Sequence, residues 1–448
     1  MGGISPALDG ARQPMTPLTI GLLYGGATLV ALFSGIPIAF ALGGVAVLFM
    51  AFFMPGASLD TVTQNVYEEM ASITLLTIPL FILKGAAIGK SRAGQDLYAA
   101  LHAWLHRIPG GLGVAVVLAC GLFAAMAGSS PATCSAIGSS GIPEMRKRGY
   151  RPGFAAGLVA AGGTLGILLP PSITLILYAV AAEQSLGRLF LAGIGPGILL
   201  LVLFSGYAML HYAGDVRGAR ETAAAGGVRS ALLDEDHFTM RDRMNALPRI
   251  LPFIILLTGV MIALYGGIAT PSETAGLGAV LALLLIAVVY GAWHLRDLKP
   301  IFASTLGESG MLMMIIGMSL LYSYVMSYLH ISQGAAEWIV SLHLSRWLLF
   351  AALVLLVIVL GFFLPPLRAA GFELVWFGVV MSVVMEMGLI HPPVGLNIFV
   401  INKIAPDISL KDIIWGTFPF VFLMMAAIVM LCVFPGIATF LPDLVYNK

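Results

Sequence analysis

Long apolar runs, separated by short polar stretches, make up most of the 448-residue chain. Crossing the hydrocarbon core of a bilayer, roughly 30 Å thick, takes about 20 helical residues, and several runs approach that length. The runs that we predict to be membrane-spanning helices are residues 18–33, 36–54, 111–127, 189–212, 252–264, 275–290, 347–363 and 413–434. The pattern therefore predicts an all-α, polytopic membrane protein.

Two further apolar helices each carry a pair of adjacent prolines near the middle. They are residues 162–178, with Pro170 and Pro171, and residues 387–399, with Pro392 and Pro393. Adjacent prolines remove two backbone donors and clash with the preceding turn, so both helices should break there. Freed backbone groups at membrane depth must be covered by protein or line a polar cavity. Because paired interruptions in two halves mark transporter sites, we expect an inverted-repeat transporter with its site at these breaks.

The remaining segments complete two similar series. Residues 73–89 and 301–329 are predicted to be re-entrant hairpins, residues 95–107 and 333–346 amphipathic arms, and residues 128–141 a loop rich in hydroxyls and glycines. We accordingly divide the chain into N-terminal scaffold helices (1–72), a first transport repeat (73–182), scaffold helices with a hydrophilic loop at 212–248 (183–300), a second transport repeat (301–405) and a C-terminal helix (406–448).

Composition agrees with a membrane protein and excludes several other classes. Hydrophobic residues make up 59% of the chain and charged residues only 10%, against roughly 25% charged residues in soluble domains. A net charge of +1 gives no reason to expect nucleic acid as a partner. The cysteines, Cys120, Cys134 and Cys432, form neither a disulfide framework nor a zinc pattern. We expect no cleaved signal peptide and no organic cofactor.

Basic residues predict the orientation of the chain. If the basic loop at 146–151 is cytoplasmic, counting spans also places residues 212–248, 296–299 and 403–411 inside. The first hairpin would then enter from outside and the second from inside. Four basic residues would fall on the outer side, against the rule: Lys84, Lys90, Arg92 and Arg107.

Six stretches in this order resemble the large membrane subunit of the tripartite ATP-independent periplasmic (TRAP) transporters. They are residues 35–43 (GIPIAFALG), 78–83 (IPLFIL), 128–138, 162–178, 270–276 (TPSETAG) and 376–397. The resemblance implies an elevator-type secondary transporter of the bacterial inner membrane that imports an organic acid with sodium. It also implies two partners, a soluble periplasmic substrate-binding protein and a small four-helix membrane subunit.

The chain departs from the family pattern in both halves. Lys84 is unusual at its position, and Ala86 stands where an asparagine is common. From Gly121 to Pro170 the first repeat takes 49 residues, but from Gly361 to Pro392 the second takes 31. We infer that a segment of the second repeat is absent, which makes a transport-impaired relative one alternative. A stand-alone carboxylate transporter that needs no binding protein is another.

Oxygen-bearing residues gather at the two breaks, where freed carbonyls can join them around a hard cation. Candidate sodium ligands are Ser130, Thr133, Thr164, Pro170, Glu386, Pro392 and Gly395. Candidate substrate-binding residues are Ser129, Ser130, Thr133, Ser172, Asn397 and Lys84, with half-helix N-termini holding the carboxylate. The alternative interpretation is close packing, since small residues let membrane helices approach one another.

Glu386 stands out because an ionisable group inside a span costs about 2.5–3.5 kcal/mol on insertion scales. It could bind sodium, carry a proton, or pair with Arg368 or His391, so proton coupling remains open. His391 itself could bind a proton or hydrogen-bond at a helix end. Lys84 could meet a substrate carboxylate or extend to the interface. Glu273 is predicted to cap a helix start with Thr270 or Ser272.

An intramembrane protease is the enzyme alternative, because residues 307–310 and 138–141 both fit a GxSG pattern. Two matches in one chain rich in glycine and serine show how little that pattern specifies. We therefore expect a transporter and not an enzyme.

Overall fold

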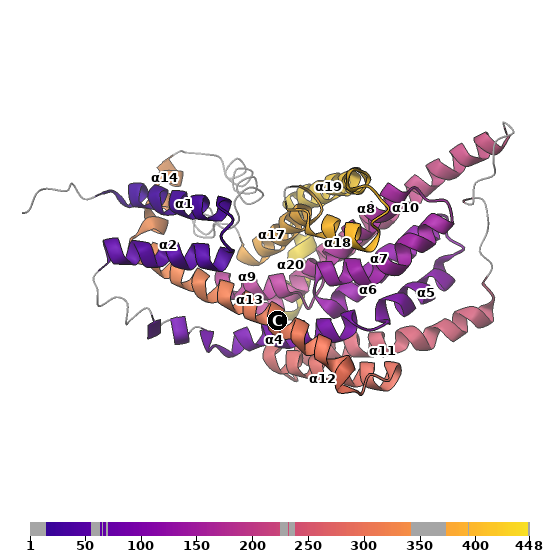
Figure 1. Ribbon diagram of the computed structural model, residues 1–448, viewed down its shortest axis with the longest axis horizontal. Coiled ribbons are helices and arrows are strands. Elements are labelled where there is room, and N and C mark those ends of the chain that lie inside the picture. The colour runs from indigo at the N-terminus through magenta and orange to yellow at the C-terminus, as the bar shows by residue number, and fades with distance from the viewer. Residues whose placement is uncertain are drawn as a thin grey trace, which may run out of the picture. The chain divides into compact units, whose positions relative to one another are not determined.

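A computed structural model describes residues 15–54, 63–64, 66–68, 70–224, 232, 238–341, 373–392 and 394–446 (Figure 1). The described residues form helices joined by short connections and include no strand, so the all-α fold is confirmed. The predicted span at 347–363, Arg368, the short connection after Gly361 and Pro393 lie outside the described residues.

The chain divides into two compact units. The first holds α1 (Pro17–Phe33), α2 (Ile38–Phe53), α14 (Ile331–Ser341) and the part of α13 (Leu295–Tyr328) that follows Ser309. Tyr24 is at its centre, with its ring stacked on Tyr322 at 4.2 Å between centroids and edge-on to Phe49 at 4.8 Å. The tyrosine is buried with Val325 and Ile331, which gives this unit an apolar core of its own.

The second unit contains the two broken helices. With the first part of α13, its helices are α4 (Ile73–Gly89), α5 (Ala93–Leu105), α6 (Gly111–Ala127), α7 (Ser130–Lys147), α8 (Pro152–Leu168), α9 (Ile173–Ala182), α10 (Leu186–Ala224), α11 (Met240–Tyr265), α12 (Pro271–Tyr290), α17 (Leu374–Leu389), α18 (Leu396–Ile404), α19 (Leu410–Val433) and α20 (Gly436–Tyr446). Among the described helices, six are long and apolar enough to cross a membrane, and seven if α4 and α5 count as one.

Helix boundaries follow the sequence signals where strong caps occur. The apolar run at 111–127 forms α6 with the predicted limits. Thr270 and Glu273 form a capping box at the start of α12, with the Thr270 backbone N–H donating to the Glu273 carboxylate at 2.8 Å, so the predicted capping role of Glu273 is confirmed. Where the sequence lacks such signals, α10 continues into the predicted hydrophilic loop as far as Ala224.

A helical hairpin is present, but not where the pattern placed one. α6 ends at Gly128, which has a left-handed φ of 64°, and α7 starts after the extended residue Ser129. A Cβ on Gly141 would lie 3.2 Å from Val116, so positions equally far from the tip meet and the two helices are antiparallel. The predicted span at 111–127 therefore forms one arm of an antiparallel helical hairpin with α7, and its crossing of the membrane stays a prediction.

The predicted loop at 128–141 is also wrong, because all but its first two residues are helical. Pro131 occupies the first turn of α7, where its missing N–H is not needed. Hydroxyls then bond back along the helix, from Thr133 Oγ1 to the Ser129 carbonyl at 2.8 Å and from Ser139 Oγ to the Ala136 carbonyl at 3.0 Å. Hydroxyl-rich sequence therefore continues as helix once its side chains bond locally.

Neither segment predicted to be a hairpin contains a turn. α4 is continuous through Pro79, and α13 is continuous through Gly307 and Gly310. The hairpin predictions for 73–89 and 301–329 are wrong because a glycine costs only about 1 kcal/mol in a helix and does not force a reversal.

α4 and α5 instead form a pair of helices bent by 63°. Near the start of α4, the Thr77 hydroxyl contacts the Ser272 hydroxyl at the start of α12, at 3.1 Å. The Tyr290 hydroxyl, at the other end of α12, donates to the Asp96 carboxylate of α5 at 2.9 Å. Because α4 and α5 meet opposite ends of α12, they run from one end of the second unit towards the other.

Ion pairs gather the predicted cytoplasmic segments at one end of the second unit. Arg146 pairs with Asp407, and Arg151 Nη2 lies 3.2 Å from Asp215 Oδ1. The residues 146–151 therefore share an end with parts of the 212–248 and 403–411 segments, as the span count requires.

The same end also contains the open end of the α6–α7 hairpin. A Cβ on Gly110 would lie 3.2 Å from Tyr212, and the ring of Tyr212 stacks on Tyr150 at 5.7 Å between centroids. The placement of Arg107 on the opposite side from the basic loop is therefore wrong. With Arg107 at the basic end, the charge distribution follows the positive-inside rule more closely.

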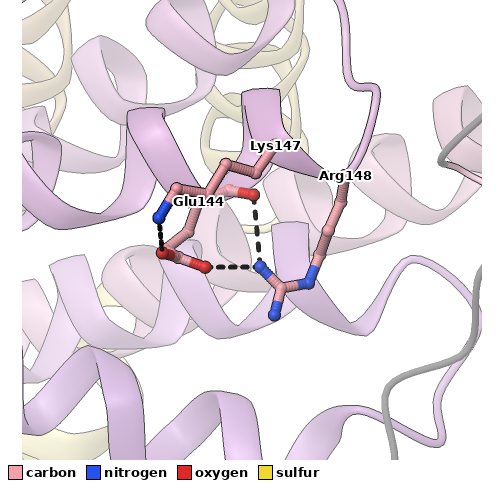
Figure 2. Close-up of polar contacts among 3 residues, drawn as sticks. All are labelled: Glu144, Lys147 and Arg148. Atoms are coloured by element: carbon pink, nitrogen blue, oxygen red, sulfur yellow. Dashed lines mark hydrogen bonds and ion pairs between the residues drawn. The ribbon is translucent and has the colours of Figure 1, made fainter.

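A local ion-pair cluster closes the C-terminal turn of α7 at this end (Figure 2). The Glu144 carboxylate accepts a hydrogen bond from Lys147 Nζ at 2.9 Å and another from Arg148 Nη1. Partial burial would raise the pKa of Glu144, but the two cationic donors outweigh it and hold the pKa below its ordinary value. The cluster therefore stabilises the base of the hairpin at neutral pH.

Candidate functional site

The tip of the α6–α7 hairpin lies against the first broken helix. α8 ends at Leu168 and α9 begins at Ile173, so the break predicted at Pro170 and Pro171 is confirmed. A Cβ on Gly128 would lie 2.7 Å from the Pro171 carbonyl oxygen, and one on Gly166 would lie 2.7 Å from the Ser129 carbonyl carbon. Backbone therefore meets backbone at both contacts, which only glycine permits.

The second broken helix has the same form. α17 ends at Leu389, and α18 starts at Leu396 after Gly395, which has a left-handed φ of 50°. The Gly395 N–H donates to the carbonyls of Gly388 and His391, both at 3.0 Å. With Pro392 inside it, this interruption confirms the second predicted break.

The two broken helices pack against each other in opposite directions. Near one end of the pair, the Tyr178 hydroxyl of α9 donates to the Leu374 carbonyl at the start of α17, at 2.7 Å. Towards the other end, Asn397 of α18 contacts the Ala160 carbonyl of α8. An antiparallel pair is what an inverted repeat requires, although the repeat relation itself stays a prediction.

α8 joins the predicted site residues of both halves. Ser130 Oγ of the hairpin donates to the Thr164 carbonyl at 3.2 Å, and Asn397 Nδ2 donates to the Ala160 carbonyl at 3.0 Å. The Thr164 hydroxyl faces the carboxyl of Glu386 on α17. These side chains are all buried, so α8 brings four predicted residues into one buried polar cluster, which we call the α8 cluster: Ser130, Thr164, Glu386 and Asn397. Thr133, one turn after the start of α7, is buried too and bonds back to the Ser129 carbonyl.

Acceptor atoms are in excess within the α8 cluster. Thr164 Oγ1 donates its proton to the Ala161 carbonyl at 2.7 Å, so this hydroxyl has no proton left for Glu386. Within the described residues, three buried oxygens accept no hydrogen bond: both carboxyl oxygens of Glu386 and the Oδ1 of Asn397. His391, a predicted partner of Glu386, has an exposed side chain. Buried acceptors without donors are uncommon in folded proteins, which marks the α8 cluster as the candidate site.

Three other predicted site residues lie outside this cluster. Ser129 precedes α7 without a side-chain cap, whereas Ser172 caps α9 by accepting a hydrogen bond from the Leu175 N–H at 3.3 Å. Lys84 is only 2% exposed and lies between α4 and α12, with its stem against Gly278 and its Nζ 4.9 Å from the centre of the Phe81 ring. The interpretation of Lys84 as a side chain that extends to the interface is therefore wrong.

Sequence reasoning missed the backbone partners of the α8 cluster. The carbonyls of Ala160 and Ala161 accept two of its hydrogen bonds, and no pattern distinguishes these alanines from their apolar neighbours. Gly85 was missed too, although a Cβ there would lie 2.3 Å from the Ala127 carbonyl oxygen near the hairpin tip. The serines of the two GxSG matches, Ser140 and Ser309, lie inside continuous helices.

Comparisons with known proteins agree with this architecture. Residues 26–437 match the family described as the tripartite ATP-independent periplasmic transporter, DctM component. The chain is 32% identical over 451 residues to the C4-dicarboxylate TRAP transporter large permease protein DctM of Rhodobacter capsulatus, with 94% of this chain and 99% of that relative covered. It is 27% identical over 442 residues to the sialic acid TRAP transporter large permease SiaM of Vibrio cholerae, with 95% and 98% covered.

Two further matches broaden the comparison. The ectoine/5-hydroxyectoine TRAP large permease UehC of Ruegeria pomeroyi is 28% identical over 438 residues, with 94% of this chain and 98% of that relative covered. The crystal structure of the YdaH transporter of Alcanivorax borkumensis superposes with a TM-score of 0.58 at 15% identity, covering 92% of this chain and 98% of that one, which shows a shared fold. The chain therefore belongs to the DctM family, as the large permease subunit of a tripartite ATP-independent periplasmic transporter, a multi-pass protein of the bacterial inner membrane.

Proposed function

We propose that this subunit imports an organic acid with sodium, taking the substrate from a periplasmic binding protein together with a small four-helix membrane subunit. The family is a transporter permease of a tripartite system, which supports the two partners. Two of its relatives are named for acids, C4-dicarboxylates and sialic acid. Organic acids are therefore the substrate class to test first.

The α8 cluster is the observation that carries the proposal. Sodium is a hard cation, and the hairpin tip together with α8 offers it the hydroxyl oxygens of Ser130, Thr133 and Thr164. The hydroxyl protons of all three are engaged with carbonyl groups, so lone pairs remain free for a cation. Carbonyls freed at the breaks, including Pro170, can complete the coordination, as can Pro392 and Gly395 in the second half.

The substrate carboxylate would bind beside this cation at half-helix N-termini. α7 begins at Ser130 and α9 begins at Ile173 after Ser172, and both starts adjoin the first break. Free backbone N–H groups and the helix dipole at such ends favour an anion. A bound sodium would neutralise the carboxylate, which gives a physical reason for coupling.

An elevator movement requires the hairpin and the broken helices to move as one body. The hydrogen bonds from Ser130 to Thr164 and from Asn397 to Ala160 link the hairpin, α8 and α18. Close packing of α8 against α7, α17 and α19 adds to that link. The observed contacts support a shared rigid body for these elements, and we propose that it carries the site across the membrane.

Uptake into proteoliposomes tests this function. Vesicles would contain the chain with its small subunit, and an inward sodium gradient would be imposed with and without the purified binding protein, across a panel of organic acids. We expect uptake only when sodium and the binding protein are both present. Equal uptake when an inward potassium gradient replaces the sodium gradient would contradict sodium coupling. Uptake without the binding protein would show a stand-alone transporter. No uptake under any condition would show a transport-impaired relative.

A further inference from the structure

An apolar groove of about 200 Å³ lies where α5, α6 and α11 meet (Figure 1). Its lining side chains are all apolar and include Leu97 of α5, Leu122 and Met126 of α6, and Ile250 and Ile254 of α11. Ile254 is 46% exposed, so the groove is open to the outside. Because α11 is long and apolar enough to cross the membrane, the groove opens towards the acyl chains of the bilayer.

α5 and α11 run antiparallel along this groove. Arg249 of α11 lies 4.0 Å from Asp96 of α5, directly beside the lining residue Ile250. Further along α5, Trp104 Nε1 donates to the Arg243 carbonyl at 3.2 Å, near the start of α11. Arg243 is seven residues before Ile250, so it lies on the same face of α11, about 10 Å beyond the groove along the helix axis. The groove therefore ends in basic residues.

The guanidinium of Arg243 pairs with no carboxylate of the described residues. Its Nη2 lies 3.3 Å from His106 Nε2. His106 Nδ1 lies 2.9 Å from the Ala103 carbonyl, which can only accept, so Nδ1 carries a proton and Nε2 is left to accept from Arg243. The neighbouring Asp242 is engaged with Thr239 in a capping box. Because Arg243 Nε is buried with no hydrogen-bond partner among the described residues, the group is held in place but not neutralised.

Positive charge is in excess at this end of the groove. The bordering segments, residues 96–107 and 239–249, contain four arginines and two aspartates. Both aspartates already have partners, since Asp96 accepts from the Tyr290 hydroxyl at 2.9 Å and Asp242 caps α11. Arg107 and Arg249 are exposed, so their guanidinium groups can reach a ligand. An anion is therefore the ligand that complements this end.

We propose that the groove binds an anionic phospholipid, with an acyl chain between α6 and α11 and the phosphate at Arg243. A groove of this volume admits a hydrocarbon chain, whereas a helix of the small subunit would be about 10–12 Å across. Basic pockets between helices on the cytoplasmic side hold anionic lipid head groups, and Arg107 lies at the end with the basic loop, which is predicted to be cytoplasmic. No residue of the α8 cluster lines the groove, so this site is additional to the transport site.

Native mass spectrometry of the purified chain with its small subunit tests the head-group preference. The complex would be incubated with equal amounts of phosphatidylglycerol and phosphatidylcholine, which share acyl chains and a phosphate but differ in net charge. We expect the wild type to retain phosphatidylglycerol preferentially. Arg243→Gln should lower this preference about fivefold, the factor that corresponds to about 1 kcal/mol per basic residue. Arg243→Lys keeps the charge and should keep most of the preference.

A second variant keeps the test decisive if Arg243→Gln does not fold. Ile254→Trp fills the groove from its exposed rim and should lower the binding of both lipids. Val288→Trp, at an exposed valine of α12, is the control for the added bulk, and Arg217→Gln, at an exposed arginine of α10, is the control for the lost charge. Both controls should bind lipid as the wild type does.

Three results would overturn the proposal. One is equal retention of the two lipids by the wild type, and another is a preference that survives unchanged in both Arg243→Gln and Ile254→Trp. The third is binding to the chain alone that disappears in the complex, because the small subunit would then cover the groove.

Melting temperatures give an independent measurement of the same site. A ligand that binds only the folded protein stabilises it, so saturating phosphatidylglycerol should raise the melting temperature of the wild-type complex more than that of Arg243→Gln. An equal rise in both would contradict a phosphate contact at Arg243. Neither measurement depends on transport, so a chain that imports no organic acid would still confirm or refute the lipid site.

Discussion

Replacing Gly166 with alanine tests whether the hairpin tip and the first break form the sodium site together. Gly166 lies in α8, one turn before the break, and its missing side chain lets α8 approach Ser129 and Ser130. An alanine Cβ would lie 2.7 Å from the Ser129 carbonyl carbon and 2.8 Å from the Ser130 amide nitrogen. The neighbours of that Cβ are backbone atoms, so no flexible side chain can move aside.

The size of the effect follows from that distance. Ordinary carbon contacts are about 3.5–4.0 Å, so the tip must move by roughly 1 Å. Overpacking of this kind costs about 1–3 kcal/mol, and the helix preference of alanine returns up to about 1 kcal/mol. Stability should therefore fall by roughly 0–2 kcal/mol. A displacement of about 1 Å can cost about 100-fold where geometry matters, so we expect sodium affinity to fall by about 10- to 100-fold.

Sodium titration of the purified complex, followed by calorimetry, measures this loss. Gly259→Ala in α11 is the matched control, because a Cβ at Gly259 would meet nothing within 4 Å. That variant should bind sodium as the wild type does and be equally or slightly more stable. Wild-type sodium affinity in a folded Gly166→Ala protein would refute the reasoning, since the tip would then not contribute to the site.

Three further predictions concern other parts of the second unit. The double variant Ser130→Ala with Thr133→Ala should weaken the sodium dependence of uptake and leave expression intact, because it removes two of the proposed hydroxyl ligands but no large volume. Lys84→Met should stabilise the fold by about 1–3 kcal/mol and so raise the melting temperature, because it replaces a buried ammonium whose one partner among the described residues is the face of the Phe81 ring. Pairing with Arg146 lowers the pKa of Asp407 below its ordinary 3.8. This contact therefore stabilises the fold above that pH and is lost as the pH falls through the lowered pKa, so melting temperatures of wild type and Arg146→Gln should differ at neutral pH and converge in acid.

Each of these three predictions can be refuted independently of the others. Unchanged sodium activation in the double variant would count against the hairpin-tip site. A destabilised Lys84→Met protein would show that the ammonium has a stabilising partner. Melting curves that stay equally far apart in acid would show that Arg146 acts through packing and not through its charge.

The apolar pattern predicted most of the helices because it reports which residues leave water, and burial of apolar surface drives that partition. α6 has the predicted limits, and α12 starts at the predicted capping box. The proline pairs predicted both breaks, since missing backbone donors act locally whatever packs around them.

The course of the chain through the membrane was predicted less well. The apolar run of α6 has the composition of a span, yet it turns back at Gly128. The run of α4 has the pattern of a hairpin, yet it forms one continuous helix, which is followed after a 63° bend by α5. Hydrophobicity does not reveal where the chain reverses, because a helix in a hairpin and a helix that spans the membrane bury the same kinds of side chain.

The sequence by itself determined that this protein is an all-α membrane transporter subunit with two broken helices, and it marked Ser130, Thr164, Glu386 and Asn397 as candidates. Only the tertiary structure decided that α8 would join them, through backbone carbonyls of alanines that carry no signal of their own. It also decided that the Thr164 hydroxyl donates to the Ala161 carbonyl. The preference of a segment for helix or break is set by its neighbours along the chain. A binding site depends instead on contacts between side chains and backbone atoms that are far apart in the sequence.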